Sequence, residues 1–111
     1  MKVVDFVDMD KNANSESSTE HFCPVCGLRL PKAPYVDGRG SFDICPCCNF
    51  QYGWLDALGK ETWESWRRKW VAAGANWDPD GAGRPSHWDP APQLRNIGID
   101  LKELREDVQR S

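Results

Sequence analysis

The sequence predicts a small α+β fold, in which a β-hairpin joins two cysteine-containing turns and is followed by a tryptophan-rich helix and short C-terminal helices. Two observations carry this prediction. The segments 22–28 (FCPVCGL) and 44–50 (ICPCCNF) align without a gap, so one cysteine motif occurs twice. Trp63, Trp66 and Trp70 then follow at i, i+3 and i+7, which is the spacing of one stripe on a helix.

Each copy of the cysteine motif has the form of a knuckle, a tight turn that directs two thiolates at one metal ion. Proline pre-sets φ in this turn, and the residue after the second cysteine usually needs a positive φ, which Gly27 and Asn49 both tolerate. The two Cys-x2-Cys pairs are separated by 18 residues, which matches a tetrahedral structural zinc site. The predicted zinc ligands are Cys23, Cys26, Cys45 and Cys48.

The stretch between the knuckles predicts a hairpin, because Asp37-Gly38 lies between residues able to form strands. A hairpin here would carry the chain from one knuckle to the other and make a zinc ribbon. The alternating aromatic residues Phe50, Tyr52 and Trp54 predict a last strand of the ribbon sheet with one aromatic face. A ribbon of about forty residues cannot build a sufficient core unaided, so we expect metal to supply the missing stability.

Two further side chains lie beside the predicted ligands in the sequence. Cys47 takes the position of Val25 in the aligned motifs, which predicts a free thiol next to the site. The alternatives for Cys47 are ligand exchange with Cys45 or Cys48, or redox release of the metal. His21 is expected to be a surface histidine, and to become a ligand if one cysteine fails to bind.

The segment 62–74 predicts a helix that covers the aromatic strand. Acidic residues lie near its start, basic residues in its last turn, and Gly74 just past its end, in the order that the helix dipole and the C-cap favour. Its tryptophans either form a core against the ribbon or leave part of the stripe exposed to anchor a partner. The candidate partner-binding residues are Trp63, Trp66, Trp70 and Arg67.

Two near repeats, NWDP at 76–79 and HWDP at 87–90, lie in a proline-rich segment at 75–93 that is expected to wrap the domain. Each Asp-Pro can start a turn or a helix, and the second is expected to start a short helix that ends at Gly98. Asp100 predicts the cap of a C-terminal amphipathic helix with Leu101, Leu104 and Val108 on its apolar stripe.

These segments predict four regions. They are a flexible N-terminal segment at 1–20, a zinc ribbon at 21–60, a Trp-rich helix with a Pro-rich wrap packed on the ribbon at 61–98, and a C-terminal amphipathic helix at 99–111. Residues 3–7 have the composition of a short edge strand. Knuckle cysteines, with neither a signal peptide nor an apolar stretch long enough for a membrane helix, predict a cytoplasmic protein.

The charge of the chain opposes binding to nucleic acid. The formal charge is −3, and four thiolates on one dication add about −2. The basic run at 67–69 reads as a solvated helix face. Tyr35, Arg39 and Phe42 on the hairpin are the one faint pattern for base stacking, so a nucleic-acid-binding zinc ribbon is an alternative. A rubredoxin-like iron redox protein is a second alternative, because two Cys-Pro-x-Cys knuckles also suit iron.

With its knuckles and following helix, the chain resembles the bacterial cysteine-rich CPCC family. The residues that carry the resemblance are CPVCG at 23–27, SFDICPCCNFQYG at 41–53, WESWRRKW at 63–70, and the later Trp88-Asp89-Pro90 and Gln93-Leu94. The resemblance implies a zinc-ribbon-like fold and a metal site, with no established enzymatic activity.

These features together favour a zinc-stabilised, non-catalytic protein-binding module with an unknown protein partner, such as a bacterial accessory or antitoxin-like protein. An enzyme is not expected, because four cysteine ligands leave no open coordination position on zinc. His21 and His87 are too few and too far apart in the sequence to predict a catalytic pair.

Overall fold

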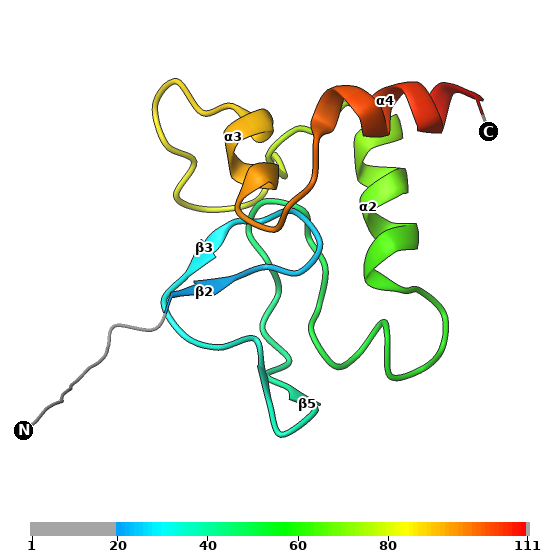
Figure 1. Cartoon of the computed structure of the whole chain (residues 1–111). Coiled ribbons are helices and arrows are strands. Elements are labelled where there is room, and N and C mark those ends of the chain that lie inside the picture. Colours follow the sequence, from blue (N-terminus) through cyan, green and yellow to red (C-terminus); the bar gives the residue numbers. More distant parts are fainter. Residues whose placement is uncertain (1–19, 111) are drawn as a thin grey trace, which may run out of the picture.

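The computed structural model describes residues 20–110. This part of the chain is a small α+β structure with two antiparallel hairpins, three helices and a cluster of four cysteines (Figure 1). The predicted strand at 3–7 and nearly all of the predicted flexible segment at 1–20 lie outside the described residues. In chain order the elements are β2 (His21–Phe22), β3 (Arg29–Leu30), β4 (Tyr35–Val36), β5 (Arg39–Gly40), α2 (Trp63–Ala72), α3 (Pro90–Arg95) and α4 (Leu101–Arg110).

The predicted hairpin at Asp37-Gly38 is confirmed. β4 and β5 pair antiparallel, with Tyr35 opposite Gly40. Asp37 and Gly38 both have positive φ, 52° and 79°, as the tight turn of a two-residue hairpin requires. A second hairpin, β2–β3, encloses the first knuckle, with His21 opposite Leu30.

The predicted aromatic strand at 50–54 is wrong. Among the described residues this stretch makes a single bridge, between Ile44 and Gln51, and the chain then turns. Gly53 has a φ of 83° and its N–H donates to a carboxylate oxygen of Asp56 at 2.9 Å, which ends the extended conformation. Phe50 and Tyr52 are buried while Trp54 is exposed, so the alternation reflects packing around the cysteines instead of one face of a sheet.

The predicted helix at 62–74 is confirmed as α2. Thr62 caps it, because its hydroxyl accepts from the Ser65 N–H and the Ser65 side chain accepts from the Thr62 N–H. Trp70 and Val71 are buried on its inner face. α4 lies beside α2 (Figure 1) and is tied to it by an ion pair between Arg68 and Asp107.

The proline-rich segment lies against the second knuckle. The Asp78 N–H donates to the Cys47 carbonyl at 2.8 Å, and the rings of Trp77 and Trp88 meet edge to face at 5.6 Å. Asp89 caps α3, with proline at its first position as predicted. Among the helices that the structure describes, none combines the length and apolar character needed to cross a bilayer.

Candidate metal centre

The two knuckles have the same backbone hydrogen bonds. In the first, the Gly27 N–H donates to the Cys23 carbonyl at 2.9 Å; in the second, the Asn49 N–H donates to the Cys45 carbonyl at 2.9 Å. Gly27 and Asn49 have φ values of 84° and 68°. The sequence repeat is therefore a structural repeat, and the positive φ predicted after each second cysteine is confirmed.

The knuckles bring the four predicted ligands together. The sulfur atoms of Cys23, Cys26, Cys45 and Cys48 all lie within 4.8 Å of one another. The Sγ–Sγ distances are 3.7 Å for Cys23–Cys48 and 3.7 Å for Cys26–Cys45. A tetrahedral zinc ion with bonds near 2.3 Å separates its sulfur ligands by about 3.8 Å, whereas a disulfide requires about 2.05 Å. The cluster thus has the spacing of a metal site, and all four thiols are free.

Burial makes this cluster a closed site. The four cysteines of the cluster are at most 4% exposed. A metal ion held there would have four protein ligands and no position facing solvent, as in structural zinc sites. Cysteine sulfur also suits a soft or borderline metal better than magnesium or calcium.

The thiols of the cluster influence one another's ionisation. Hydrogen bonds from Cys23 and then Cys26 lower the pKa of Cys45. Burial raises the pKa of Cys26 well above its usual value, and the hydrogen bond with Cys23 raises the pKa of Cys48. Cys26 and Cys48 therefore retain protons in the metal-free cluster. Metal binding must displace these protons, so metal affinity should fall as pH falls.

Tyr52 places a hydroxyl group beside the sulfurs. Its oxygen is buried, and no group in the described part of the chain completes a hydrogen bond with it. Burial raises the pKa of Tyr52, and so does negative charge on Cys23 and Cys45. A buried hydroxyl without a partner is costly. A metal-bound thiolate would supply the missing acceptor, so the orphaned hydroxyl fits a metal-loaded site.

Helix α2 contacts both knuckles through adjacent side chains. The Arg67 guanidinium donates to the carbonyls of Val25 and Pro24 at 2.8 and 2.7 Å. The Trp66 indole N–H donates to the Cys48 carbonyl at 2.8 Å. Burial lowers the pKa of Arg67, while negative charge on Glu64 and on the cluster cysteines raises it. A cation held this close would offset the negative charge that four thiolates impose on a divalent ion.

Cys47 is buried but does not belong to the four-sulfur cluster. The Gln93 amide N–H donates to its sulfur at 3.3 Å and to the Cys26 carbonyl at 3.1 Å. The Trp88 indole N–H in turn donates to the Gln93 amide oxygen at 2.8 Å. α3 thus holds Cys47 beside the site, as the sequence predicted, and ligand exchange or redox release stay hypotheses.

The predicted partner-binding residues do not form one exposed stripe. Trp70 is buried, and its indole N–H donates to the Asn76 carbonyl. Trp66 packs edge to face on Phe50 with ring centres 5.8 Å apart. Arg67 donates hydrogen bonds to the backbone of the first knuckle. Trp63 remains 42% exposed. Partner binding by these residues stays a prediction, and Trp63 is the member of the set whose exposure supports it best.

Only some of the hairpin side chains that suggested base stacking have an exposed ring. Phe42 is exposed. The Tyr35 hydroxyl donates to Asp56 at 2.6 Å and accepts from the Trp63 indole N–H at 3.1 Å. The rings of Tyr35 and Trp63 lie 5.4 Å apart. Tyr35 therefore joins the hairpin to α2 instead of presenting a free face.

His21 lies half-buried in β2 and is not part of the cysteine cluster.

Sequence reasoning did not predict the contacts that three side chains make around the cluster. Each of these side chains lies far along the chain from the residue it contacts. Tyr52 is 29 residues from Cys23, Arg67 is 42 residues from Val25, and Gln93 is 67 residues from Cys26. The repeated Trp-Asp-Pro pattern located the short helix that carries Gln93, but no local pattern distinguished this glutamine from a surface one.

Comparison with known proteins identifies a relative without a known function. No protein-family model matches the chain, and no solved structure matches it. The uncharacterized protein YoaQ of Bacillus subtilis (strain 168) is 29% identical over 68 residues, covering 47% of this chain and 58% of YoaQ. The chain therefore spans less than two thirds of this curated relative. The resemblance to the CPCC family stays a prediction.

Proposed function

We propose that this chain is a non-catalytic, zinc-stabilised protein-binding module of zinc-ribbon type. The observation that carries the proposal is the closed, buried cluster of four cysteine sulfurs held by two matching knuckles. Cys23, Cys26, Cys45 and Cys48 would hold the ion. When bound, zinc supplies folding free energy of about 10–16 kcal/mol in such sites, and a four-cysteine site offers no position for substrate or water.

An exposed aromatic side chain supports the protein-binding part of the proposal. Trp63 is 42% exposed, although tryptophan buries much apolar area when it packs. Trp63 is held in place by the hydrogen bond from its indole N–H to Tyr35. A rigid, exposed tryptophan on a helix is the kind of residue that dominates protein interfaces.

The alternative of nucleic-acid binding has less support. Tyr35 is committed to Asp56 and Trp63, and the basic run of α2 is divided between internal partners. Arg67 binds the first knuckle, Arg68 pairs with Asp107, and Lys69 pairs with Glu61. Tight nucleic-acid binders commonly neutralise about 6–10 phosphates, and these side chains cannot make that many phosphate contacts.

Free thiols are typical of a reducing compartment, so we also propose a cytoplasmic location.

A comparison of two tryptophan variants tests the proposal. Protein partners are captured from the native cell with the unmodified chain, with Trp63→Ala and with Trp54→Ala as the matched exposed control. We expect one protein to be captured specifically, to be lost with Trp63→Ala and to be retained with Trp54→Ala. Zinc content is measured on all three samples to show that the fold is intact. Micromolar, salt-dependent binding of random DNA or RNA oligonucleotides to the unmodified chain would contradict the proposal.

A further inference from the structure

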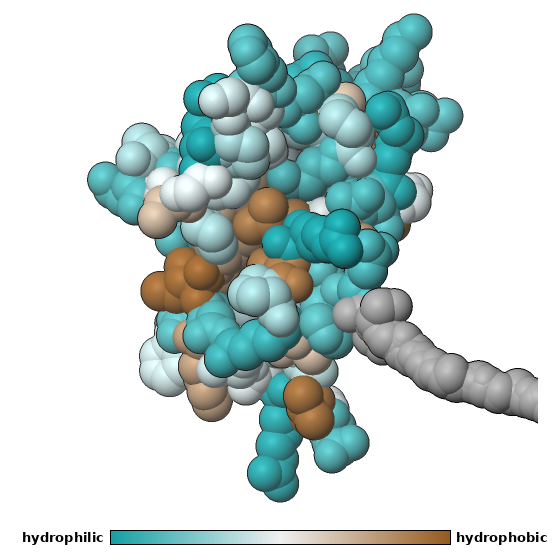
Figure 2. Space-filling model, turned by 90° about the vertical axis from the view of Figure 1, so that its left-hand side faces the viewer, coloured by the Kyte–Doolittle hydropathy of each residue, from teal (hydrophilic) through white to brown (hydrophobic). Residues whose placement is uncertain are grey.

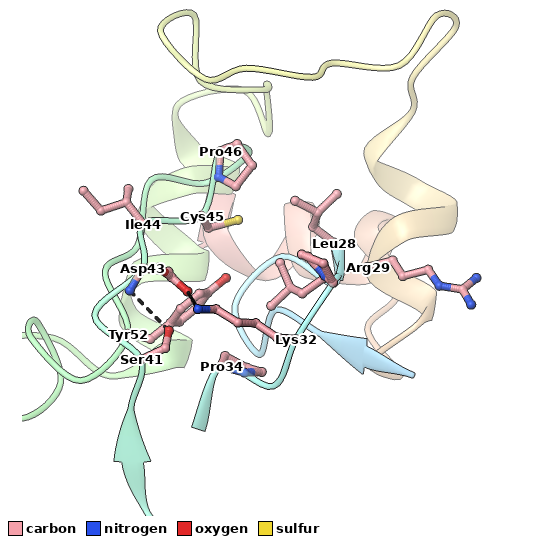
Figure 3. A pocket seen from close by; sticks show the side chains of 12 residues that line it. Leu28, Arg29, Lys32, Pro34, Ser41, Asp43, Ile44, Cys45, Pro46 and Tyr52 are labelled. Atoms are coloured by element: carbon pink, nitrogen blue, oxygen red, sulfur yellow. Dashed lines mark hydrogen bonds and ion pairs between the residues drawn. The ribbon is translucent and has the colours of Figure 1, made fainter. Parts of the chain in front are cut away.

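A groove of about 350 Å³ lies between the segment 28–34 and the second knuckle (Figure 3). Leu28 and Leu30 line one side, and Ile44 and Pro46 line the other. Ile44 is 55% exposed, so this wall reaches the surface. Figure 2 shows apolar residues gathered between hydrophilic ones on the surface. The volume falls in the lower part of the range for binding pockets, so the groove suits one small molecule.

An ion pair bridges the groove. The Lys32 Nζ atom and a carboxylate oxygen of Asp43 lie 3.3 Å apart, and Figure 3 shows this pair connecting the two walls. The two side chains are 70% and 54% exposed, so the pair contributes little free energy and can open. Arg29, the other cation of the lining, pairs with Glu20. Because the charges of the lining are paired within the chain, the groove suits an uncharged molecule.

The groove reaches the cysteine cluster. Cys45 and Tyr52 line it, whereas the other three cysteines of the cluster do not. Figure 3 shows the Cys45 sulfur directed into the space between the two walls. The Tyr52 hydroxyl is buried and has no hydrogen-bond partner in the described part of the chain. A molecule in the groove would therefore lie next to one particular sulfur of the cluster.

Packed backbone covers the outer faces of both knuckles. The Asn96 side-chain amide, just after α3, donates to the Gly27 carbonyl at 3.0 Å. A Cβ on Gly81 would lie 1.8 Å from the Pro46 carbonyl oxygen, so the proline-rich segment lies directly against the second knuckle. Helix α2 donates hydrogen bonds to both knuckles. Approach to the sulfurs from these sides would displace packed elements, whereas approach along the groove requires an exposed ion pair to open.

We propose that the groove is the route by which a small, uncharged thiol exchanges the metal ion of the centre, and that Cys45 is the first cysteine to be replaced. The inference rests on the metal-binding part of the proposed function. A thiol suits this role because sulfur donors bind the same soft or borderline metals that cysteine binds. The incoming sulfur takes the place of the Cys45 sulfur at the ion, and its proton passes to the Cys45 sulfur. The exchange therefore involves no oxidation and no net change of charge.

Zinc transfer from the loaded full-length chain to dimercaprol, a small uncharged dithiol, tests the inference. Lys32→Ala removes the bridging ion pair and should speed transfer several-fold, whereas Lys60→Ala, at an exposed lysine outside the groove lining, should leave the rate unchanged. Leu30→Phe narrows the groove and should slow transfer several-fold, whereas Val36→Phe, at an exposed residue outside the lining, should leave the rate unchanged. The zinc that remains on the protein is measured over time after rapid desalting. Zinc affinity, measured by chelator competition, should stay unchanged because no variant alters a cysteine.

Alkylation identifies the cysteine of the cluster that a small molecule reaches first. The zinc-loaded chain is treated with less than one equivalent of N-ethylmaleimide, and the modified cysteines are identified by peptide mass spectrometry. We expect Cys45 to be modified before Cys23, Cys26 and Cys48. Earlier modification of any of these three would overturn the inference.

Two kinetic results would also overturn it. Gln93→Ala removes the side-chain contacts of α3 with the Cys26 carbonyl and with Cys47. If this variant speeds transfer while Lys32→Ala and Leu30→Phe leave the rate unchanged, the ion leaves after α3 opens and not through the groove. A rate that does not depend on the dimercaprol concentration would likewise show that the fold opens first. A chain that binds no zinc would contradict the proposed function and the inference together, whereas equal transfer rates for all zinc-loaded variants would overturn the inference alone.

Discussion

Cys47 and Cys48 are adjacent in the chain but have different surroundings. Cys48 belongs to the four-sulfur cluster, whereas Cys47 accepts a hydrogen bond from Gln93. Cys48→Ser should abolish tight zinc binding, because it removes one of four thiolates from a closed site. Cys47→Ser should leave one zinc per chain. Elemental analysis of the two variants checks this, and a loss of zinc with Cys47→Ser would make Cys47 a ligand.

The Tyr52 hydroxyl should strengthen metal binding. It is buried beside Cys23 and Cys45 without another hydrogen-bond partner in the described chain. Removing a group that supports metal ligands typically costs about 10–100-fold in affinity, and we expect Tyr52→Phe to fall at the lower end of this range. Chelator competition measures the change. Tyr35→Phe, which removes a hydroxyl bonded to Asp56, is the matched control and should leave zinc affinity unchanged.

Tyr35 should titrate late. Burial raises its pKa to about 12, and the hydrogen bond to Asp56 adds to the shift. Because the pKa in the folded state lies above the value near 10 of an unfolded chain, the stability that Tyr35 contributes is fully present below about pH 10. It is lost as pH rises through the folded pKa. Ultraviolet titration of the Tyr52→Phe variant, which leaves Tyr35 as the single tyrosine, should show this late ionisation. A midpoint near 10 would refute it.

At the residue scale, the cluster of four cysteines was predictable because cysteine spacing and knuckle chemistry are local. The sequence placed Cys23, Cys26, Cys45 and Cys48 in one site, and the structure brings their sulfurs together. The supporting roles of Tyr52, Arg67 and Gln93 were not predictable, because these residues come near the cluster only after the chain has folded.

Gly27 tests how closely two elements approach each other. A Cβ on Gly27 would lie 2.1 Å from the Gln93 carbonyl oxygen of α3, whereas a Cβ on Gly59 would meet nothing within 4 Å. Both glycines have left-handed φ, 84° and 71°, so alanine at either costs about 1–2 kcal/mol in backbone strain. Gly27→Ala should cost about 1–3 kcal/mol more through overpacking. Denaturant unfolding of both variants measures the difference, and equal losses would contradict the packing of α3 on the first knuckle.

Elements with local signals were predicted well. The Asp37-Gly38 turn, the cap order of α2 and the Asp89-Pro90 start of α3 each satisfy a requirement of the backbone within a few residues. The aromatic strand at 50–54 was predicted wrongly, because buried residues at every second position also occur outside sheets. Here Phe50 and Tyr52 are buried around the cysteines, whereas Trp54 is exposed. The turn at Gly53 depends on a hydrogen bond with Asp56 that alternation does not reveal.

At the scale of the whole molecule, the cysteine cluster lies within the hydrophobic core of the described residues. One buried group contains the four clustered cysteines, Phe50, Tyr52 and Leu94. Helices α2 and α3 contact this group through Trp66, Arg67 and Gln93. Without a metal ion, buried thiols and an unpaired hydroxyl would lie at the point where these elements meet. The hairpins and helices should therefore lose their arrangement together.

Native mass spectrometry of the full chain, purified without added metal, tests most directly the claim that one zinc ion stabilises this fold. We expect one zinc ion per chain in a narrow distribution of low charge states. Adding a strong chelator should remove the ion and shift the chain to the broad, high charge states of an unfolded protein. A chain that stays in the low charge states without any metal would contradict the account, and a chain that carries iron in place of zinc would support the rubredoxin-like alternative instead.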